Sequence, residues 1–108
     1  MNTGDIVLVP FPFSELTKVK VRPAIVVTTT KDKYKDLILC AVSSVVPSEI
    51  RDCEILLNPN KTNNLRATSV VKTDRIVTLK REIVITKLGK LTITETKQLI
   101  NKFKGLIE

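Results

Sequence analysis

Residues 21–27, with the sequence Val-Arg-Pro-Ala-Ile-Val-Val, constrain the fold of this chain more than any other stretch. Four of the five residues that follow Pro23 are isoleucine, valine or threonine, a composition typical of a buried β-strand. Proline is tolerated at the start of a strand, and it biases the preceding residue toward extended backbone. The pattern therefore predicts a core strand that holds the guanidinium of Arg22 at its rigid entrance.

Other segments share this β-rich composition and are predicted as strands: residues 6–9, 37–44, 53–57, 68–73, 75–79 and 82–86. The prolines and phenylalanines of residues 10–13 predict that the first strand stops at Val9 and that a long loop continues to Lys20. Long loops in small barrels often carry function. The loop therefore becomes a candidate binding segment.

One helix is predicted at the C-terminal end. Thr92 and Glu95 have the spacing of a capping box, and apolar residues then recur at helical spacing, at Leu99, Ile100, Phe103, Leu106 and Ile107. Short strands followed by one helix predict a mainly β fold, a small and partly open barrel that carries a C-terminal helix. With 108 residues the chain is expected to form a single domain over residues 1–108.

The charge of the chain is strongly asymmetric. Residues 1–60 hold seven basic and seven acidic side chains, whereas residues 61–108 hold eleven basic and four acidic ones, which gives the net +7. A basic half is typical of proteins that bind a polyanion or an acidic partner, although a lysine-rich surface without a partner fits the charge equally well. No signal peptide or membrane-spanning run is visible, so we expect a cytoplasmic protein without a membrane partner.

The residue types exclude most catalytic chemistries. The chain has no histidine, which removes a serine–histidine dyad and a histidine metal site, and its three glycines form no phosphate loop. Cys40 and Cys53 lack metal-ligand spacing and are interpreted as reduced core thiols, with a single disulfide as the alternative. Arginine, hydroxyl and carboxylate groups remain. We therefore expect neither a metal nor a cofactor.

Arg22 and the pair Ser43 and Ser44 each lie at the polar end of an apolar strand. If these strands are neighbours, a guanidinium and a hydroxyl could converge on one phosphate. Spacing alone favours a simpler interpretation, in which the arginine pairs with a surface carboxylate and the serines only end a strand.

Five segments, taken in order, resemble the MazF/PemK family of toxin endoribonucleases: residues 4–13, 21–27, 38–44, 69–79 and 88–92. The resemblance spans nearly the whole chain. It implies an SH3-like barrel of the MazF/PemK/CcdB type with a C-terminal helix, usually a homodimer. It also implies metal-independent cleavage of single-stranded RNA through a 2′,3′-cyclic phosphate. The implied protein partner is an acidic, MazE-like antitoxin whose flexible tail lies across the RNA site.

By this resemblance, the family's catalytic arginine falls on Arg22 and its catalytic threonine falls on Ser43. Serine keeps the hydroxyl but lacks the methyl group that stiffens the side chain, and Ser44 is the substitute candidate. Where better-known members carry glutamine, this chain has Asp74 and Arg75. The remaining residues expected to contact RNA are Ser44, Phe11, Phe13, Thr17, Lys18, Lys20, Asp74 and Arg75, although at least one of the two phenylalanines is expected to anchor the loop on the barrel instead.

Two other functions stay open at this stage. CcdB-like toxins share the fold and poison DNA gyrase by binding alone, without cleavage. The Arg22-Pro23 motif favours the nuclease, because a gyrase binder does not need an arginine there. The second alternative is a catalytically inactive RNA-binding barrel, which the serine at position 43 makes plausible. RNA cleavage separates the enzyme from both alternatives, and salt-sensitive RNA binding separates the two alternatives from each other.

Overall fold

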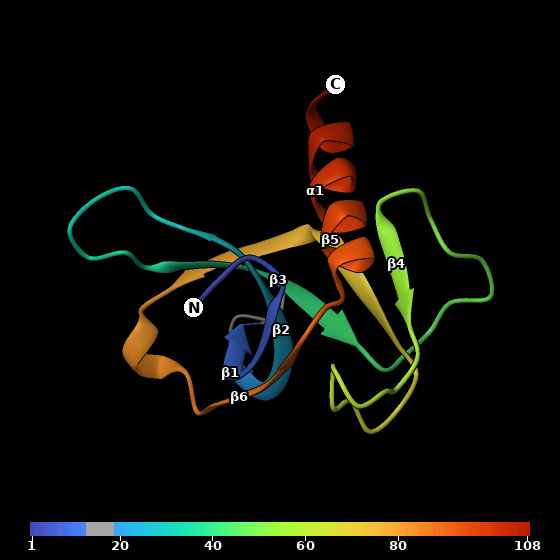
Figure 1. Cartoon of the computed structure of the whole chain (residues 1–108), viewed down its shortest axis with the longest axis horizontal. Helices are drawn as coiled ribbons and strands as arrows, with labels where there is room; N and C mark the ends of the chain where they lie inside the picture. Colours follow the sequence, from blue (N-terminus) through green and yellow to red (C-terminus); the bar gives the residue numbers. More distant parts are fainter. Residues whose placement is uncertain (13–18) are drawn as a thin grey trace.

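A computed structural model describes residues 1–12 and 19–108 (Figure 1). The described strands form one curled antiparallel sheet with the order β4-β5-β3-β2-β1-β6. They are β1 (Asp5–Pro12), β2 (Val19–Thr29), β3 (Leu37–Ser43), β4 (Glu54–Leu57), β5 (Ser69–Leu79) and β6 (Thr86–Lys90). A short 3₁₀ helix, η1 (Arg81–Ile83), precedes β6, and the helix α1 (Ile93–Ile107) follows it. The predicted fold class, mainly β with a C-terminal helix, is confirmed.

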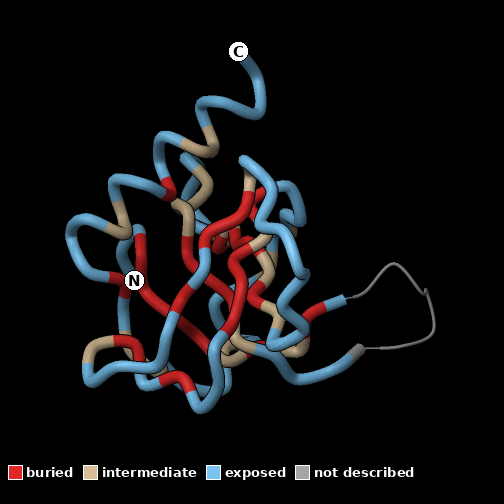
Figure 2. Tube along the Cα trace, turned by 90° about the vertical axis from the view of Figure 1, so that its right-hand side faces the viewer, coloured by how far each residue is buried: buried red, intermediate tan, exposed pale blue. Residues whose placement is uncertain are grey.

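Two core clusters pack against the sheet, and successive residues of β1 and β2 belong to them in turn. Ile6 and Ile25 belong to the core cluster that also holds Leu99 of α1. Val7 and Val26, their neighbours in sequence, belong to a second cluster. This alternation is the two-residue period of a β-strand. Figure 2 shows the buried positions running along the strands at the centre of the molecule.

Helix α1 begins as predicted. The Thr92 Oγ1 accepts a hydrogen bond from the Glu95 N–H (3.2 Å), and the Glu95 carboxylate accepts one from the Thr92 N–H (2.9 Å). Leu99 is fully buried, but three apolar side chains after it are exposed, at Ile100, Leu106 and Ile107. The apolar stripe therefore covers the core over only part of its length. The described part of the chain contains no helix that is long and apolar enough to cross a membrane.

The prediction that the first strand stops at Val9 was wrong. Strand β1 continues to Pro12, and Pro10, Phe11 and Pro12 each pair with a residue of β2. The pairing of β1 with β6 ends at Leu8, so the last residues of β1 have β2 as a ladder partner on one side alone among the described residues. Proline is compatible with such an edge position, because no neighbouring strand needs its missing N–H.

Two strand predictions in the C-terminal half also need correction. The segment 82–86, predicted as a strand, lies mostly in η1 and the short connection after it, and the strand β6 begins only at Thr86. The hydrophobic residues of that segment suggested a strand, yet Ile83 and Ile85 are exposed. The segments 68–73 and 75–79 form one strand, β5, with an irregularity between them. In both cases the bounds of the strand depend on its pairing with neighbouring strands, which composition alone does not determine.

The two cysteines are free, as predicted, but they differ in exposure. Burial raises the pKa of the Cys40 thiol to about 12, whereas Cys53 is partly exposed. Since the thiolate is the reactive form, the native chain is expected to react with a thiol reagent at Cys53 and to spare Cys40, whose thiol is buried and protonated. Labelling at pH 8 with and without urea measures this. In the variant Cys53→Ser, rapid labelling of the native protein would contradict the prediction.

Candidate active site

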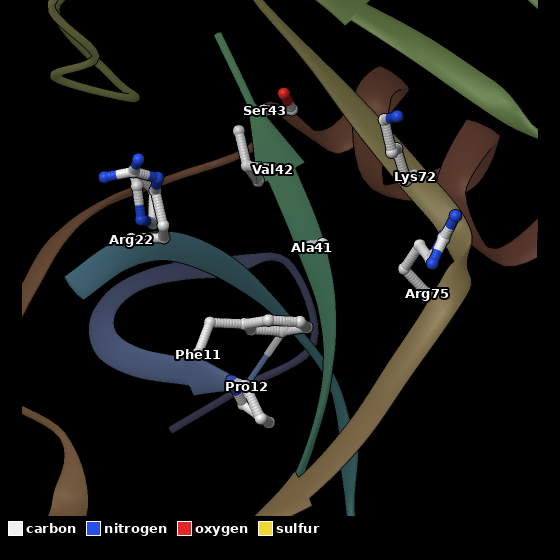
Figure 3. Close-up of a pocket in the computed structure, with 9 residues that line it drawn as sticks. Phe11, Pro12, Arg22, Ala41, Val42, Ser43, Lys72 and Arg75 are labelled. Carbon is white, nitrogen blue, oxygen red and sulfur yellow. The ribbon is translucent and has the colours of Figure 1, made fainter. Parts of the chain in front are cut away.

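A pocket opens where strands β2 and β3 separate. Their ladder runs from the pair Thr29 and Leu37 to the pair Ala24 and Ala41, where it ends. Continued by two residues, the same register would place Arg22 opposite Ser43. Instead, these two side chains line a pocket of about 220 Å³, together with residues of β1 and β5. The full lining, most of it labelled in Figure 3, is Phe11, Pro12, Arg22, Pro23, Ala41, Val42, Ser43, Lys72 and Arg75.

The lining of the pocket is cationic above an apolar floor. Phe11 is 6% exposed and belongs to the second core cluster, against which Ala41 also packs. Three lining residues carry a positive charge, and no described lining residue carries a carboxylate. Charges of one sign beside low-dielectric walls strengthen the local potential. The described part of the pocket is therefore suited to an anion.

Arg22 is held by the strand that the sequence predicts. It pairs with Val9 of β1, which places its side chain on the face of the second core cluster, at the rim of the pocket. One guanidinium nitrogen, Nη1, donates a hydrogen bond to the carbonyl of Val21 (3.1 Å). The proline that follows fixes the backbone on the other side. The arginine is exposed to solvent at this position.

Ser43 ends β3 with its hydroxyl in a defined environment. The Oγ accepts a hydrogen bond from the backbone N–H of Val45 (3.1 Å). A hydroxyl that accepts in this way keeps its own proton to donate. Ser44 is exposed and is not among the residues that line the pocket.

The other predicted RNA contacts are distributed unevenly. Phe11 and Arg75 line the pocket. Lys20 lies opposite Phe11 in the ladder of β1 and β2, is exposed, and does not line the pocket. Asp74 also lies outside the lining, and its carboxylate forms an ion pair with Arg51 (Nη1 to Oδ2, 3.3 Å). Phe13, Thr17 and Lys18 lie outside the described residues.

Lys72 is a pocket residue that the sequence analysis missed. It lies opposite Ala41 of β3 on one side and opposite Glu54 of β4 on the other. In the sequence, Lys72 is only a charged residue in an otherwise apolar strand. Its alternation with Val71 and Thr73 indicates that Lys72 lies on the opposite face of the sheet from these two residues. Only the register of β3 and β5 shows that Lys72 lies beside the end of β3, where Ser43 is.

Arg51 links the chain segment before β4 to strand β5. Its guanidinium contacts Asp74 and also Glu54 (Nε to Oε1, 3.3 Å), whose side chain is almost fully buried. The backbone N–H of Arg51 donates to the Glu54 carboxylate (2.9 Å), and together with the Arg51 guanidinium it lowers the pKa of Glu54 below its ordinary value. Among the described residues, no group of three or more histidine, cysteine or acidic side chains has the arrangement of a metal site.

Comparisons with known proteins support the fold. The solved structure of the Mycobacterium tuberculosis toxin MazF-mt6 superimposes with a TM-score of 0.70 at 15% identity, covering 95% of each chain. An endoribonuclease in complex with its cognate antitoxin, from a mycobacterial species, gives a TM-score of 0.73 at 13% identity and covers 99% of this chain and 94% of its own. A further mycobacterial endoribonuclease gives 0.69 at 15% identity, covering 99% and 93%.

At these identities the structures establish the fold alone. By sequence, no curated protein matches the chain significantly. The sequence model of one family, described as "PemK-like, MazF-like toxin of type II toxin-antitoxin system", matches residues 2–107. This match covers nearly the whole chain and agrees with the resemblance carried by the Arg22-Pro23 segment. The chain therefore belongs to the family of PemK-like, MazF-like toxins of type II toxin–antitoxin systems.

Proposed function

We propose that this toxin is an endoribonuclease that cleaves single-stranded RNA without a metal ion, with Arg22 and Ser43 as its catalytic residues. The observation that carries the proposal is their meeting in one cationic pocket, from strands that the sequence separates. The described lining offers guanidinium, ammonium and hydroxyl groups, which bind phosphate oxygens. It lacks the carboxylate and imidazole groups that usually hold a catalytic metal.

The proposed reaction uses the RNA as its own nucleophile. The ribose 2′-oxygen attacks the adjacent phosphorus, and the bond from phosphorus to the 5′-oxygen breaks. The products are a 2′,3′-cyclic phosphate and a 5′-hydroxyl, so no water is consumed in this step. The phosphorane transition state carries more negative charge on its oxygens than the starting diester. A fixed guanidinium at Arg22 stabilises that state more than the ground state, and this difference accelerates the reaction.

Ser43 supplies a hydrogen bond to the same phosphate. Its Oγ already accepts from the Val45 N–H, which leaves the hydroxyl proton for a non-bridging oxygen. This backbone hydrogen bond restricts the serine in place of the methyl group that a threonine would provide.

The 2′-hydroxyl proton passes to water and the leaving 5′-oxygen takes its proton from water, because the described pocket residues include no carboxylate or imidazole and arginine stays protonated in proteins. Electrostatic stabilisation then supplies most of the acceleration, and turnover is expected to be slow.

The proposal extends to two protein partners. One of the similar structures is an endoribonuclease bound to its cognate antitoxin. The cationic pocket of this chain suits an acidic antitoxin segment, which would compete with RNA for the same charges. We expect the toxin to form a homodimer, as its family does.

The test is incubation of the purified protein with a long single-stranded RNA in the presence of EDTA. Discrete fragments with 5′-hydroxyl and 2′,3′-cyclic phosphate ends are expected. Intact RNA in the presence of folded protein would overturn the nuclease. Salt-sensitive RNA binding would then indicate an inactive RNA-binding barrel, and its absence would direct attention to DNA gyrase.

A further inference from the structure

The cations of the pocket fall into two groups. Figure 3 shows Arg22 on one side of strand β3 and Lys72 and Arg75 on the other, both on β5. A pocket of about 220 Å³ is smaller than the roughly 300–1,000 Å³ of ordinary ligand sites. It therefore admits part of a nucleotide chain, whose neighbouring phosphates continue along the surface. Separate cations on opposite sides of β3 fit such a chain better than a single phosphate.

An irregularity in β5 brings Lys72 and Arg75 to the same pocket. Side chains three residues apart on a regular strand point to opposite faces of the sheet. In β5, Lys72 pairs with Ala41 and Ile76 pairs with Cys40, so the three residues between them oppose no residue of β3. This bulge, residues 73–75, changes the facing of the strand. As a result, both cations line the pocket.

The bulge is fixed by two contacts to the segment before β4. The backbone N–H and the hydroxyl of Thr73 both donate to the carbonyl of Cys53, at 3.2 and 2.5 Å. The carboxylate of Asp74 accepts from both terminal nitrogens of Arg51, at 3.3 and 3.4 Å. Asp74 therefore pairs with Arg51, and in the sequence it directly precedes Arg75, which lines the pocket.

We propose that Lys72 and Arg75 form a second phosphate-binding subsite, which holds a phosphate next to the scissile one, and that Asp74 acts as its positioning residue through Arg51. The proposal rests on the proposed RNA cleavage, and it adds to it a separate site for the RNA backbone. Lys72 and Arg75 bind the substrate before and during the reaction alike. Their loss should therefore raise KM, whereas loss of Arg22 should lower kcat.

The first test uses a DNA oligonucleotide with one ribonucleotide at the mapped cleavage site, and a neutral methylphosphonate at either neighbouring linkage. The variants Lys72→Ala and Arg75→Ala should each raise KM about tenfold and leave kcat nearly unchanged. For the wild-type protein, a methylphosphonate at one of the two linkages should likewise raise KM about tenfold. On that same oligonucleotide, Lys72→Ala and Arg75→Ala should raise KM little further, because the charge that they would contact is already absent. Full additivity at both linkages, or a loss in kcat, would overturn the subsite.

The second test uses the direction in which a charge-removing substitution at Asp74 changes RNA binding. The variant Asp74→Asn removes a negative charge, so a general field effect would strengthen RNA binding. A positioning role predicts the reverse, a several-fold increase in KM, and no further increase in the background of Arg75→Ala. Thr73→Val, which removes one donor to Cys53 at similar volume, should also raise KM. Binding that is unchanged or tighter in both variants would overturn the positioning role.

The two proposals fail in different ways. If the wild-type protein cleaves no RNA, the nuclease is wrong, and the subsite is tested by fluorescence anisotropy with an all-DNA oligonucleotide. Lys72→Ala and Arg75→Ala should each weaken binding and reduce the salt dependence by about one counterion. Arg81→Ala is the matched control, because this exposed arginine of η1 has the same charge and does not line the pocket. Equal weakening in the control would overturn the subsite.

Discussion

Replacing Arg22 with alanine is expected to lower kcat for RNA cleavage by roughly 10²–10³-fold, the usual effect of removing one preorganised donor from a developing oxyanion. The guanidinium lies at the rim of a pocket with an apolar floor, and it donates a hydrogen bond to the carbonyl of Val21. Its contribution should therefore appear mostly in the transition state. Single-turnover cleavage with excess protein measures the chemical step directly, and KM should change much less.

Two further variants make this result specific. Arg22→Lys keeps a charge but loses the planar pair of donors, so it should recover only part of the lost rate. Arg81→Ala removes the same charge from a position outside the pocket and should stay near the wild-type rate. Full activity in Arg22→Ala would place the chemistry elsewhere in the chain. An equal loss in Arg81→Ala would show that total charge, rather than the site, governs cleavage.

The fold was predictable wherever local pattern and long-range pairing agree. The run of β-branched residues after Pro23 identified β2, and the capping box at Thr92 located the start of α1. The predictions failed where pairing decides. Pro10 stays in a strand because β6 no longer pairs with that part of β1, and the apolar residue Ile85 is exposed. Composition shows which conformations a residue tolerates, whereas pairing with a neighbouring strand determines which of them the residue adopts.

The same division holds for the site. Arg22 and Ser43 were predicted as site residues from the family resemblance, since their positions at strand ends alone favoured a simpler interpretation, and the structure brings both to one pocket. Lys72 was missed, because its place in the pocket depends on the register between β3 and β5. Asp74 was predicted as an RNA contact from its position in the family pattern, but that pattern contains no information about Arg51. An ion pair between residues 23 positions apart becomes evident only in the folded chain.

The second large effect is expected at Gly89, in the middle of β6. A Cβ atom added there would overlap the carbonyl oxygen of Thr62 and lie 2.8 Å from the backbone of Asn63. That loop cannot easily retreat. Asn63 is fully buried, its side-chain oxygen accepts from the N–H groups of Asn60 and Leu65, and the Thr62 carbonyl accepts from the Lys90 N–H (3.0 Å). Gly89→Ala is therefore expected to reduce the free energy of unfolding by about 2–3 kcal/mol, the cost of overpacking against backbone.

Gly105 provides the matched control, because a Cβ atom there meets nothing within 4 Å. It lies in α1, where replacing glycine with alanine stabilises by up to about 1 kcal/mol. Both substitutions restrict the unfolded chain equally, so the difference between them isolates the contact made by Gly89 in the folded state. Urea denaturation should show a lower midpoint for Gly89→Ala and an unchanged or higher one for Gly105→Ala, at similar m values. Equal midpoints would mean that the loop at Thr62 and Asn63 moves to accommodate the added Cβ atom, and that β6 does not require glycine at position 89.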